Sequence, residues 1–267
     1  MEVSAYLERI EYDGSLEPDL DTLRALHRSH MLAVPFENLD IHLGQPISLH
    51  EEALFEKIVA RRRGGFCYEL NASFAALLRG LGFQVAYLSA RVAREGGSYS
   101  QEFDHLALLV HLTGAEDGKS ARRILGPDPE RWLADVGFGD SFLEPLRLDE
   151  PGSQEEAGSA YRIEREGIHR IVWQRPGGGL WERLYCFTLQ PRRLQDFSGM
   201  CRYHQTSPES GFTQRRICTR AIPSGRITLS DTRFVTTQQG KKVEQPVNGE
   251  SQFYMLLKDQ FGLELLP

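Results

Sequence analysis

The sequence predicts an α+β protein in which helices come first, strands follow, and a mixed region closes the chain. Three observations support this prediction. Apolar residues recur at helical spacing through residues 1–83, and from Gln84 they alternate with the two-residue period of a strand. After Pro191, short strand-like segments lead into one last amphipathic segment. This order does not fit a doubly wound parallel sheet, in which helices and strands alternate along the chain.

The first long helix is expected to begin at an aspartate cap, Asp19 or Asp21, and to end before Pro35. His27 and His30 stand one helical turn apart on its inner face. No carboxylate or third histidine lies at a matching offset, so a metal site is not indicated. We interpret the two histidines as a packed or solvated pair.

A second helix is expected over residues 51–62, and a third begins at Cys67, because the apolar residues of segment 70–81 recur at helical spacing. Gly64 and Gly65 allow a sharp turn just before it. A cysteine in the first turn of a helix lies at the positive end of the helix dipole, which favours the thiolate. Cys67 is therefore the best candidate nucleophile, and a small buried core residue is the alternative.

Strands are expected over the segment that follows the third helix and in two further apolar runs. A hairpin with a proline–glycine turn comes next, and the C-terminal region is expected to hold short strands and a closing helix. The expected strands are 84–92, 105–112, 132–138, a hairpin over 168–189 that turns at 176–179, and then 212–219, 226–230 and 233–237, with a helix over 251–261. Residues 113–130 and 149–160 are expected to be exposed connections, the second one mobile.

A thiolate nucleophile needs a base, and eight histidines are available. His105 and His111 share one face of their strand, opposite four apolar side chains. A histidine at the first position of a strand can point toward a site, or it can be a satisfied polar group. Asp135 is unusual inside an apolar strand, because a buried carboxylate needs a partner. It either meets such a partner or caps a turn at the end of the strand.

The composition is that of an ordinary soluble protein of 267 residues, with 40% hydrophobic and 25% charged residues. A net charge of −6 without a long basic run argues against nucleic acid, and no apolar run approaches a membrane span or a signal peptide. The four cysteines, Cys67, Cys186, Cys201 and Cys218, are expected to be reduced in a cytoplasmic protein. Cys201, His204 and Cys218 lack the second close pair of a zinc site, so no metal is expected.

Residues 63–71 (RGGFCYELN) resemble the active-cysteine motif of the arylamine N-acetyltransferase family. Four other segments fit the same family in the same order: 34–40 (VPFENLD), 104–110 (DHLALLV), 132–139 (WLADVGFG) and 204–212 (HQTSPESGF). The resemblance covers nearly the whole chain. It implies an N-terminal helical bundle (1–85), a central antiparallel β-barrel (86–195) and a C-terminal α/β lid (196–267), with an active-site arrangement like that of cysteine proteases.

The resemblance also implies a catalytic triad of Cys67, His105 and Asp135. In the mechanism it implies, Cys67 takes the acetyl group of acetyl-coenzyme A as a thioester and passes it to the nitrogen of an arylamine or arylhydrazine. His105 exchanges the protons, and Asp135 fixes its tautomer. The implied ligands are therefore coenzyme A and a small aromatic amine or hydrazine.

The binding residues that the resemblance implies lie inside the same motifs. The turn beside the phosphates of coenzyme A would consist of Gly137, Phe138 and Gly139. The acceptor pocket would be lined by Phe36, Phe66 and Phe138. Asp140 departs from the family, in which another glycine is frequent, and an acidic side chain there would oppose a close pyrophosphate.

Three other functions fit part of the pattern. An amide synthase that closes a macrolactam would use the same triad with a different acceptor. A papain-like hydrolase shares the cysteine–histidine arrangement, but the motif around its cysteine differs. A non-catalytic binding protein would keep the fold, but it would have no chemical need for all three triad residues.

Overall fold

The computed structural model describes residues 2–112, 130–156 and 158–265. Its N-terminal region is helical, as the sequence predicts. Asp19 caps the first long helix by accepting the backbone N–H of Thr22 at 2.8 Å. Segment 51–62 forms a short α-helix followed by a π-helical turn instead of one α-helix. The elements are α1 (Val3–Arg9), α2 (Leu20–Ala33), β1 (Phe36–Glu37), α3 (Leu39–His42), α4 (Glu51–Phe55), the π-helical η1 (Glu56–Ala60) and α5 (Cys67–Gly80).

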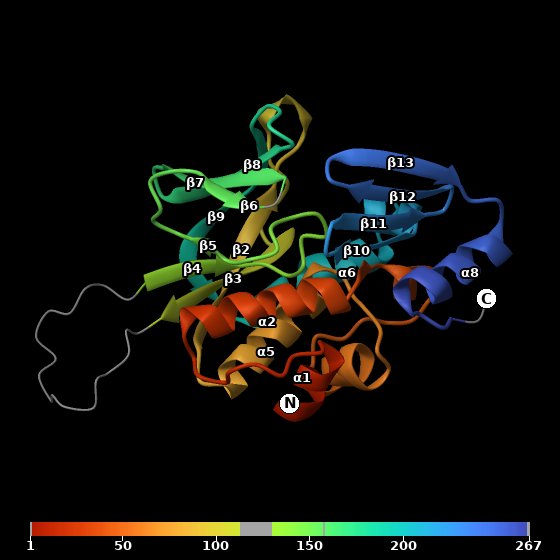
Figure 1. Ribbon diagram of the computed structural model, residues 1–267, viewed down its shortest axis with the longest axis horizontal. Helices are drawn as coiled ribbons and strands as arrows, with labels where there is room; N and C mark the ends of the chain where they lie inside the picture. Colours follow the sequence, from red (N-terminus) through yellow and green to blue (C-terminus); the bar gives the residue numbers. More distant parts are fainter. Residues whose placement is uncertain (1, 113–129, 157, 266–267) are drawn as a thin grey trace, which may run out of the picture.

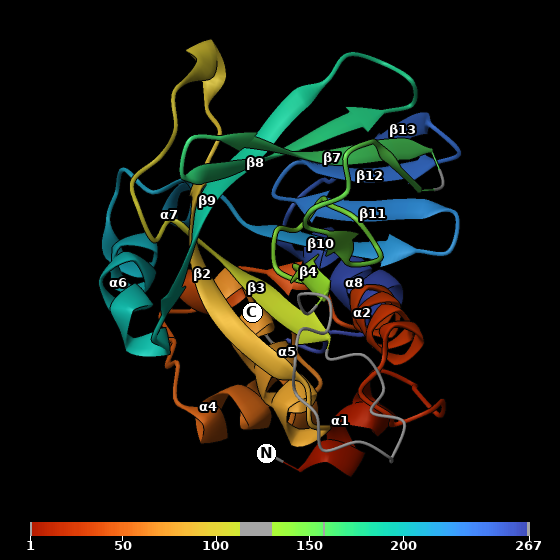
Figure 2. The same ribbon diagram turned by 90° about the vertical axis from the view of Figure 1, so that its left-hand side faces the viewer.

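The central region is an eight-stranded antiparallel sheet with the order β5-β4-β3-β2-β9-β8-β7-β6. Figures 1 and 2 show how strongly this sheet twists over the helices, and it is the expected barrel. The strands are β2 (Gln84–Val92), β3 (His105–Leu112), β4 (Glu130–Ala134), β5 (Leu146–Arg147), β6 (Gln154–Glu156), β7 (Ser159–Glu166), β8 (His169–Pro176) and β9 (Glu182–Arg192), with a 3-10 turn η2 (Glu95–Gly97). The expected mobile loop 149–160 instead contains β6 and the start of β7. The connection expected over 113–130 lies outside the described residues, apart from Glu130.

The C-terminal region holds a second, five-stranded antiparallel sheet with the order β1-β10-β11-β12-β13. Its edge strand β1 comes from the N-terminal region, where Phe36 pairs with Thr219. The elements are η3 (Leu194–Phe197), α6 (Ser198–Thr206), α7 (Gly211–Gln214), β10 (Ile217–Ile222), β11 (Gly225–Ser230), β12 (Arg233–Gln238), β13 (Lys241–Pro246) and α8 (Glu250–Phe261).

One expectation for this region is wrong, and two of its elements were not expected. Residues 211–214 form helix α7 instead of the start of the strand expected over 212–219, and helix α6 was not expected. The hydroxyl of Ser210 accepts the N–H of Phe212 and so caps α7. Strand β13 was also not expected, because every one of its residues is exposed and no apolar alternation marks it.

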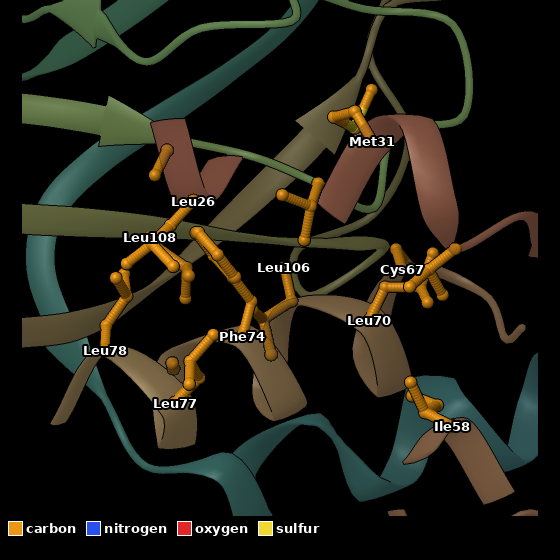
Figure 3. Close-up of a cluster of buried hydrophobic side chains, with 14 of the residues drawn as sticks. Leu26, Met31, Ile58, Cys67, Leu70, Phe74, Leu77, Leu78, Leu106 and Leu108 are labelled. Atoms are coloured by element: carbon orange, nitrogen blue, oxygen red, sulfur yellow. The ribbon is translucent and has the colours of Figure 1, made fainter. Parts of the chain in front are cut away.

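Three clusters of buried apolar side chains hold these layers together. The first cluster joins α2 and α5 to one face of β3. The second consists mainly of side chains from the strands of the eight-stranded sheet, and the third lies between α8 and the C-terminal sheet. In Figure 3, Phe74 and Leu77 of α5 lie opposite Leu106 and Leu108 of β3, and Cys67 stands at one end of this row. In the part of the chain that the structure describes, no helix is both long and apolar enough to span a membrane.

Candidate active site

Cys67 is the first residue of α5, and the turn before it is tight. A Cβ atom on Gly64 would lie 2.0 Å from the carbonyl oxygen of Pro35, so only glycine fits there. The N–H of Phe66 donates to the carboxylate of Glu69 at 3.1 Å, which satisfies one donor at the start of the helix. The glycine turn and this hydrogen bond therefore fix the position of Cys67 at the start of α5.

Buried ion pairs join the two motifs around this turn. Arg63 lies 2.7 Å from both Glu37 and Asp40, and Lys57 lies 2.8 Å from Glu69. All five side chains are buried. Removing one partner of a buried pair leaves the other charge uncompensated, which typically costs about 3–5 kcal/mol. The charged residues of these motifs therefore support the start of α5.

His105 and Asp135 form a direct hydrogen bond. Nε2 of His105 lies 2.7 Å from Oδ2 of Asp135, and both side chains are buried. The other oxygen of Asp135 accepts from Nδ2 of Asn71 at 2.9 Å and from the N–H of Gly137 at 3.0 Å. Burial alone would raise the pKa of Asp135, but the His105 ring and these hydrogen bonds hold it below its ordinary value. Asp135 is therefore an ionised acceptor that keeps the proton of His105 on Nε2.

The strand predicted over 132–138 ends four residues earlier in the structure. Beyond its end, backbone N–H groups donate to side chains instead of to a neighbouring strand. The N–H of Asp135 donates to Nε2 of His27 at 3.1 Å, and that of Val136 donates to Oδ1 of Asn71 at 3.0 Å. Asp135 thus both turns the chain and meets a buried partner, which unites the two alternatives that the sequence leaves open.

His27 on α2 holds this turn, a role that sequence reasoning missed. Its Nδ1 donates to the carbonyl oxygen of Leu143 at 2.8 Å, while Nε2 accepts from Asp135. Burial lowers the pKa of His27 to about 4, so the ring is neutral with its proton on Nδ1. His30 is also fully buried, so the pair is packed and not solvated. The position of His27 on the inner face of α2 was the only feature of the sequence that pointed to this role.

Burial and nearby charges act on the thiol of Cys67. Burial raises its pKa, and the nearby carboxylates, Asp104 foremost, raise it further, whereas a hydrogen bond with the backbone of Leu106 lowers it. Burial and the carboxylates therefore oppose the effect of the helix start, and the expectation that the helix start favours a thiolate stays a prediction.

Two neighbours of the His105–Asp135 pair, Leu106 and Gly137, lie next to Cys67, and no hydrogen bond joins the side chains of Cys67 and His105 in the described residues. Leu106, which follows His105, contacts the sulfur. A Cβ atom on Gly137 would lie 2.8 Å from Cα of Cys67, so the turn after Asp135 packs directly on the helix start. Nδ1 of His105 has no hydrogen-bond partner among the described residues. It is therefore the nitrogen that is free to accept a proton.

The predicted pocket residues fall into two groups around the helix start. The rings of Phe36 and Phe66 both contact Phe212, at centroid distances of 6.1 and 5.9 Å, and the ring of Phe138 contacts that of His105 at 5.2 Å. Phe66 is fully buried, whereas Phe138 and Phe212 are half-buried. Sequence reasoning missed Phe212, although it lies inside the last of the five motifs.

A second histidine–aspartate pair lies nearby. Nε2 of His204 lies 3.0 Å from Oδ1 of Asp104, and its Nδ1 lies 3.0 Å from the hydroxyl of Ser210. Cys201 shares the helix of His204, but Cys218 belongs to the core beneath α8. Among the described residues no group of three histidine, cysteine or acidic side chains converges as metal ligands would. The zinc alternative therefore has no support in the geometry.

Known proteins resemble this chain over nearly its whole length. A profile of the N-acetyltransferase family matches residues 19–266. The chain is 36% identical to an arylamine N-acetyltransferase / N-hydroxyarylamine O-acetyltransferase of Salmonella typhimurium, over 97% of this chain and 88% of the relative. It is 29% identical to a proansamycin X synthase of Amycolatopsis mediterranei, over 96% and 95%. A solved Mycobacterium marinum arylamine N-acetyltransferase in complex with CoA superimposes with a TM-score of 0.86 at 30% identity, over 98% of this chain and 93% of that one.

These matches define an acyltransferase. The chain belongs to the arylamine N-acetyltransferase family. Both the cysteine-hydrolase alternative and the non-catalytic alternative are therefore wrong.

Proposed function

We propose that the protein transfers an acetyl group from acetyl-coenzyme A to the nitrogen of an arylamine or arylhydrazine through a thioester on Cys67. The observation that carries this proposal is the His105–Asp135 hydrogen bond of 2.7 Å, which leaves Nδ1 of His105 without a partner in the described residues beside the helix that begins at Cys67. The names of the Salmonella and Mycobacterium relatives support the two substrates.

In the first half of the reaction, Nδ1 of His105 accepts the thiol proton of Cys67. The thiolate attacks the carbonyl carbon of acetyl-coenzyme A, the carbon–sulfur bond to coenzyme A breaks, and its sulfur leaves with the proton from His105. Asp135 stabilises the imidazolium that exists between these two steps. The high pKa that burial gives Cys67 makes this base necessary.

In the second half, the amine nitrogen attacks the carbonyl carbon of acetyl-Cys67. His105 accepts the proton that the nitrogen loses, the thioester bond breaks, and the proton returns to the sulfur of Cys67. The products are the amide and the free enzyme. We propose Phe36, Phe138 and Phe212 as the aromatic surfaces for the acceptor, with the fully buried Phe66 packed behind them.

The test separates the two halves. Acetyl-coenzyme A without amine should add one acetyl group to the intact mass and release about one equivalent of coenzyme A per site as a burst. Cys67→Ser should abolish both, while Cys186→Ser, in the central sheet, should retain both. Varying both substrates should give parallel double-reciprocal lines. Intersecting lines without a burst would contradict the covalent intermediate.

One relative carries the name of a synthase, which favours an amide synthase with the same triad as the second candidate. That enzyme would form no acetyl adduct from free acetyl-coenzyme A, so the burst experiment distinguishes the two.

A further inference from the structure

A cavity of about 500 Å³ lies between the N-terminal helices and the C-terminal sheet, among residues that the proposed reaction does not use. Its walls come from the ends of α1, η1, α2 and α8 and from β10 with the turn after it, and Figures 1 and 2 show α8 beside α2. Three arginines line it, Arg9, Arg62 and Arg220. This concentration of positive charge stands out in a chain whose net charge is −6.

Arg9 fastens the helix ends around the cavity. Its guanidinium group donates to four backbone carbonyl oxygens, those of Ala33, Ile58, Arg62 and Arg63. Burial first, and then the charges of Arg62 and Arg220, lower the pKa of Arg9 to about 10. The hydrogen bonds of Arg9 therefore explain its presence, and the other two arginines are close enough for their charges to act on it.

Arg62 and Arg220 keep hydrogen-bond donors that the protein does not use. Nη2 of Arg220 donates to the carbonyl oxygen of Gln260 at 2.9 Å, but Nε is buried without a partner, and Nη1 has none among the described residues. The exposed side chain of Arg62 makes no hydrogen bond or ion pair in the described part of the chain. The cavity therefore presents guanidinium N–H groups that have no acceptor.

The acidic side chains at the cavity do not neutralise these charges. Glu11 and Asp259 belong to its walls, and both are exposed. Glu11 acts electrostatically on two of the arginines but forms an ion pair with neither in the described residues. Lys258 also lines the cavity, and it is paired with Glu264 at 2.9 Å. Three guanidinium charges thus face two carboxylates, and positive charge remains.

Two charged residues of the cavity stand where the backbone favours glycine. Glu11 and Arg62 are each the second residue after a helical segment, α1 and η1, and their φ angles are +56° and +49°. Glycine is the ordinary residue in this left-handed conformation at a helix end. Neither the backbone nor a side-chain bond therefore gives a reason for an arginine at position 62.

We propose that this cavity binds an organic phosphate ester, with its phosphate group on Arg62 and Arg220 and its apolar body against the remaining wall. A phosphate dianion suits the site because its oxygens can accept from two planar guanidinium groups whose charges match its own. A volume of about 500 Å³ is that of a small-molecule site. The apolar part of the wall includes Ile10, Leu32, Ala33, Ala221, Ile222 and Phe261.

The test measures the binding of phenyl phosphate by calorimetry at constant ionic strength. One molecule should bind per chain, more tightly than phenol, inorganic phosphate or benzoate, since each of these lacks the dianion or the apolar body. Arg62→Gln and Arg220→Gln should each weaken this binding about tenfold, because each removes charge-assisted hydrogen bonds. Glutamine at position 220 can still donate to the carbonyl oxygen of Gln260. Glu11→Gln should tighten the binding a few-fold, because it removes an opposing charge.

Arg61→Gln is the matched control. Arg61 is the exposed neighbour of Arg62 and carries the same charge, but it does not line the cavity. Its replacement should leave the affinity for phenyl phosphate within twofold of that of the unaltered protein. An effect as large as that of Arg62→Gln would show that only the overall charge of the protein matters, and this would overturn the proposal.

Stability without ligand separates binding from support of the fold. Arg62→Gln should not lower the free energy of unfolding, measured with urea, because the side chain has no partner to lose and its charge repels that of Arg9. If this variant is less stable and binds phenyl phosphate as the unaltered protein does, Arg62 is structural and the proposal fails. It also fails if phenyl phosphate shows no saturable binding, or if phenol or benzoate binds as tightly.

Discussion

Residues 104 and 105 are neighbours in the chain, yet each belongs to a different histidine–aspartate pair. His105 bonds to Asp135, and Asp104 bonds to His204, through Nε2 of the histidine in both cases. The hydrogen bonds are 2.7 and 3.0 Å long, so the pairs look alike in isolation. Their difference lies in the second nitrogen of each ring and in what surrounds the aspartate.

The second nitrogen decides which pair can act as a base. Nδ1 of His204 is bonded to the hydroxyl of Ser210, whereas Nδ1 of His105 has no partner in the described residues. Asp135 is fully buried and held by several donors, while Asp104 is partly exposed. A histidine–aspartate contact alone therefore does not indicate a catalytic role. The free Nδ1 of His105 and the fixed carboxylate of Asp135 support the role that we propose for this pair.

Replacing Asp135 with Asn is expected to have the largest effect. The amide can donate to Nε2 of His105, which moves the ring proton to Nδ1 and removes the acceptor for the Cys67 thiol. The corresponding change in a serine triad costs about 10⁴ in kcat, and we expect a loss of similar order in the release of coenzyme A. Pre-steady-state kinetics would measure it, with circular dichroism to check the fold. If Asp104→Asn reduces acetylation as strongly, the two histidine–aspartate pairs do not differ in the way we propose.

Much of this site could be predicted from the sequence because its residues lie in local motifs. Cys67 begins a helix and His105 begins a strand, as the periodicity indicates, and the resemblance names both as members of a triad whose catalytic role stays a prediction. The domain boundaries near 85 and 195 also stay a prediction. The 2.7 Å bond between His105 and Asp135 confirms only the contact between these two residues.

The contacts that the sequence could not predict are those between segments far apart in the chain. His27 reaches Asp135 across 108 positions, and Arg226 reaches Gly139 across 87. No periodicity or spacing encodes such pairs, since they depend on how helices and sheets pack. Strand β13 was missed for a different reason: it is stabilised by pairing with β12 and not by a buried face.

The pH dependence of stability tests whether His27, which accepts the N–H of Asp135, stays neutral in the folded protein. The pKa of His27 falls from about 6.5 in the unfolded chain to about 4 in the folded protein, so the unfolded state binds more protons between these values. Its contribution to stability is fully present above about pH 6.5 and is lost as the pH falls toward 4. At pH 5 the loss is about 2 kcal/mol. Urea unfolding of His27→Gln should therefore show a shallower fall in stability between pH 7 and pH 5.

His50→Gln is the matched control for this change, because His50 is exposed. His30 is present in both variants, and burial is the largest cause that lowers its pKa, ahead of its neighbour His27. Equal pH dependence in the unaltered protein and in His27→Gln would show that His27 does not stay neutral in the folded state.

Asp104→Asn is expected to give the smallest effect, and one of opposite sign. After burial, the charge of Asp104 is the largest cause that raises the pKa of Cys67, so removing it favours the thiolate. The midpoint of the pH dependence of Cys67 alkylation should move down by about one unit or less, which corresponds to tenfold or less in rate at pH 7. Asparagine can still accept the hydrogen bond from His204, so the local structure has no reason to change. His204→Gln keeps the charge of Asp104 and should not accelerate alkylation. If both variants accelerate it equally, the second pair acts on Cys67 through packing, and its charge is not what distinguishes it from the pair at His105.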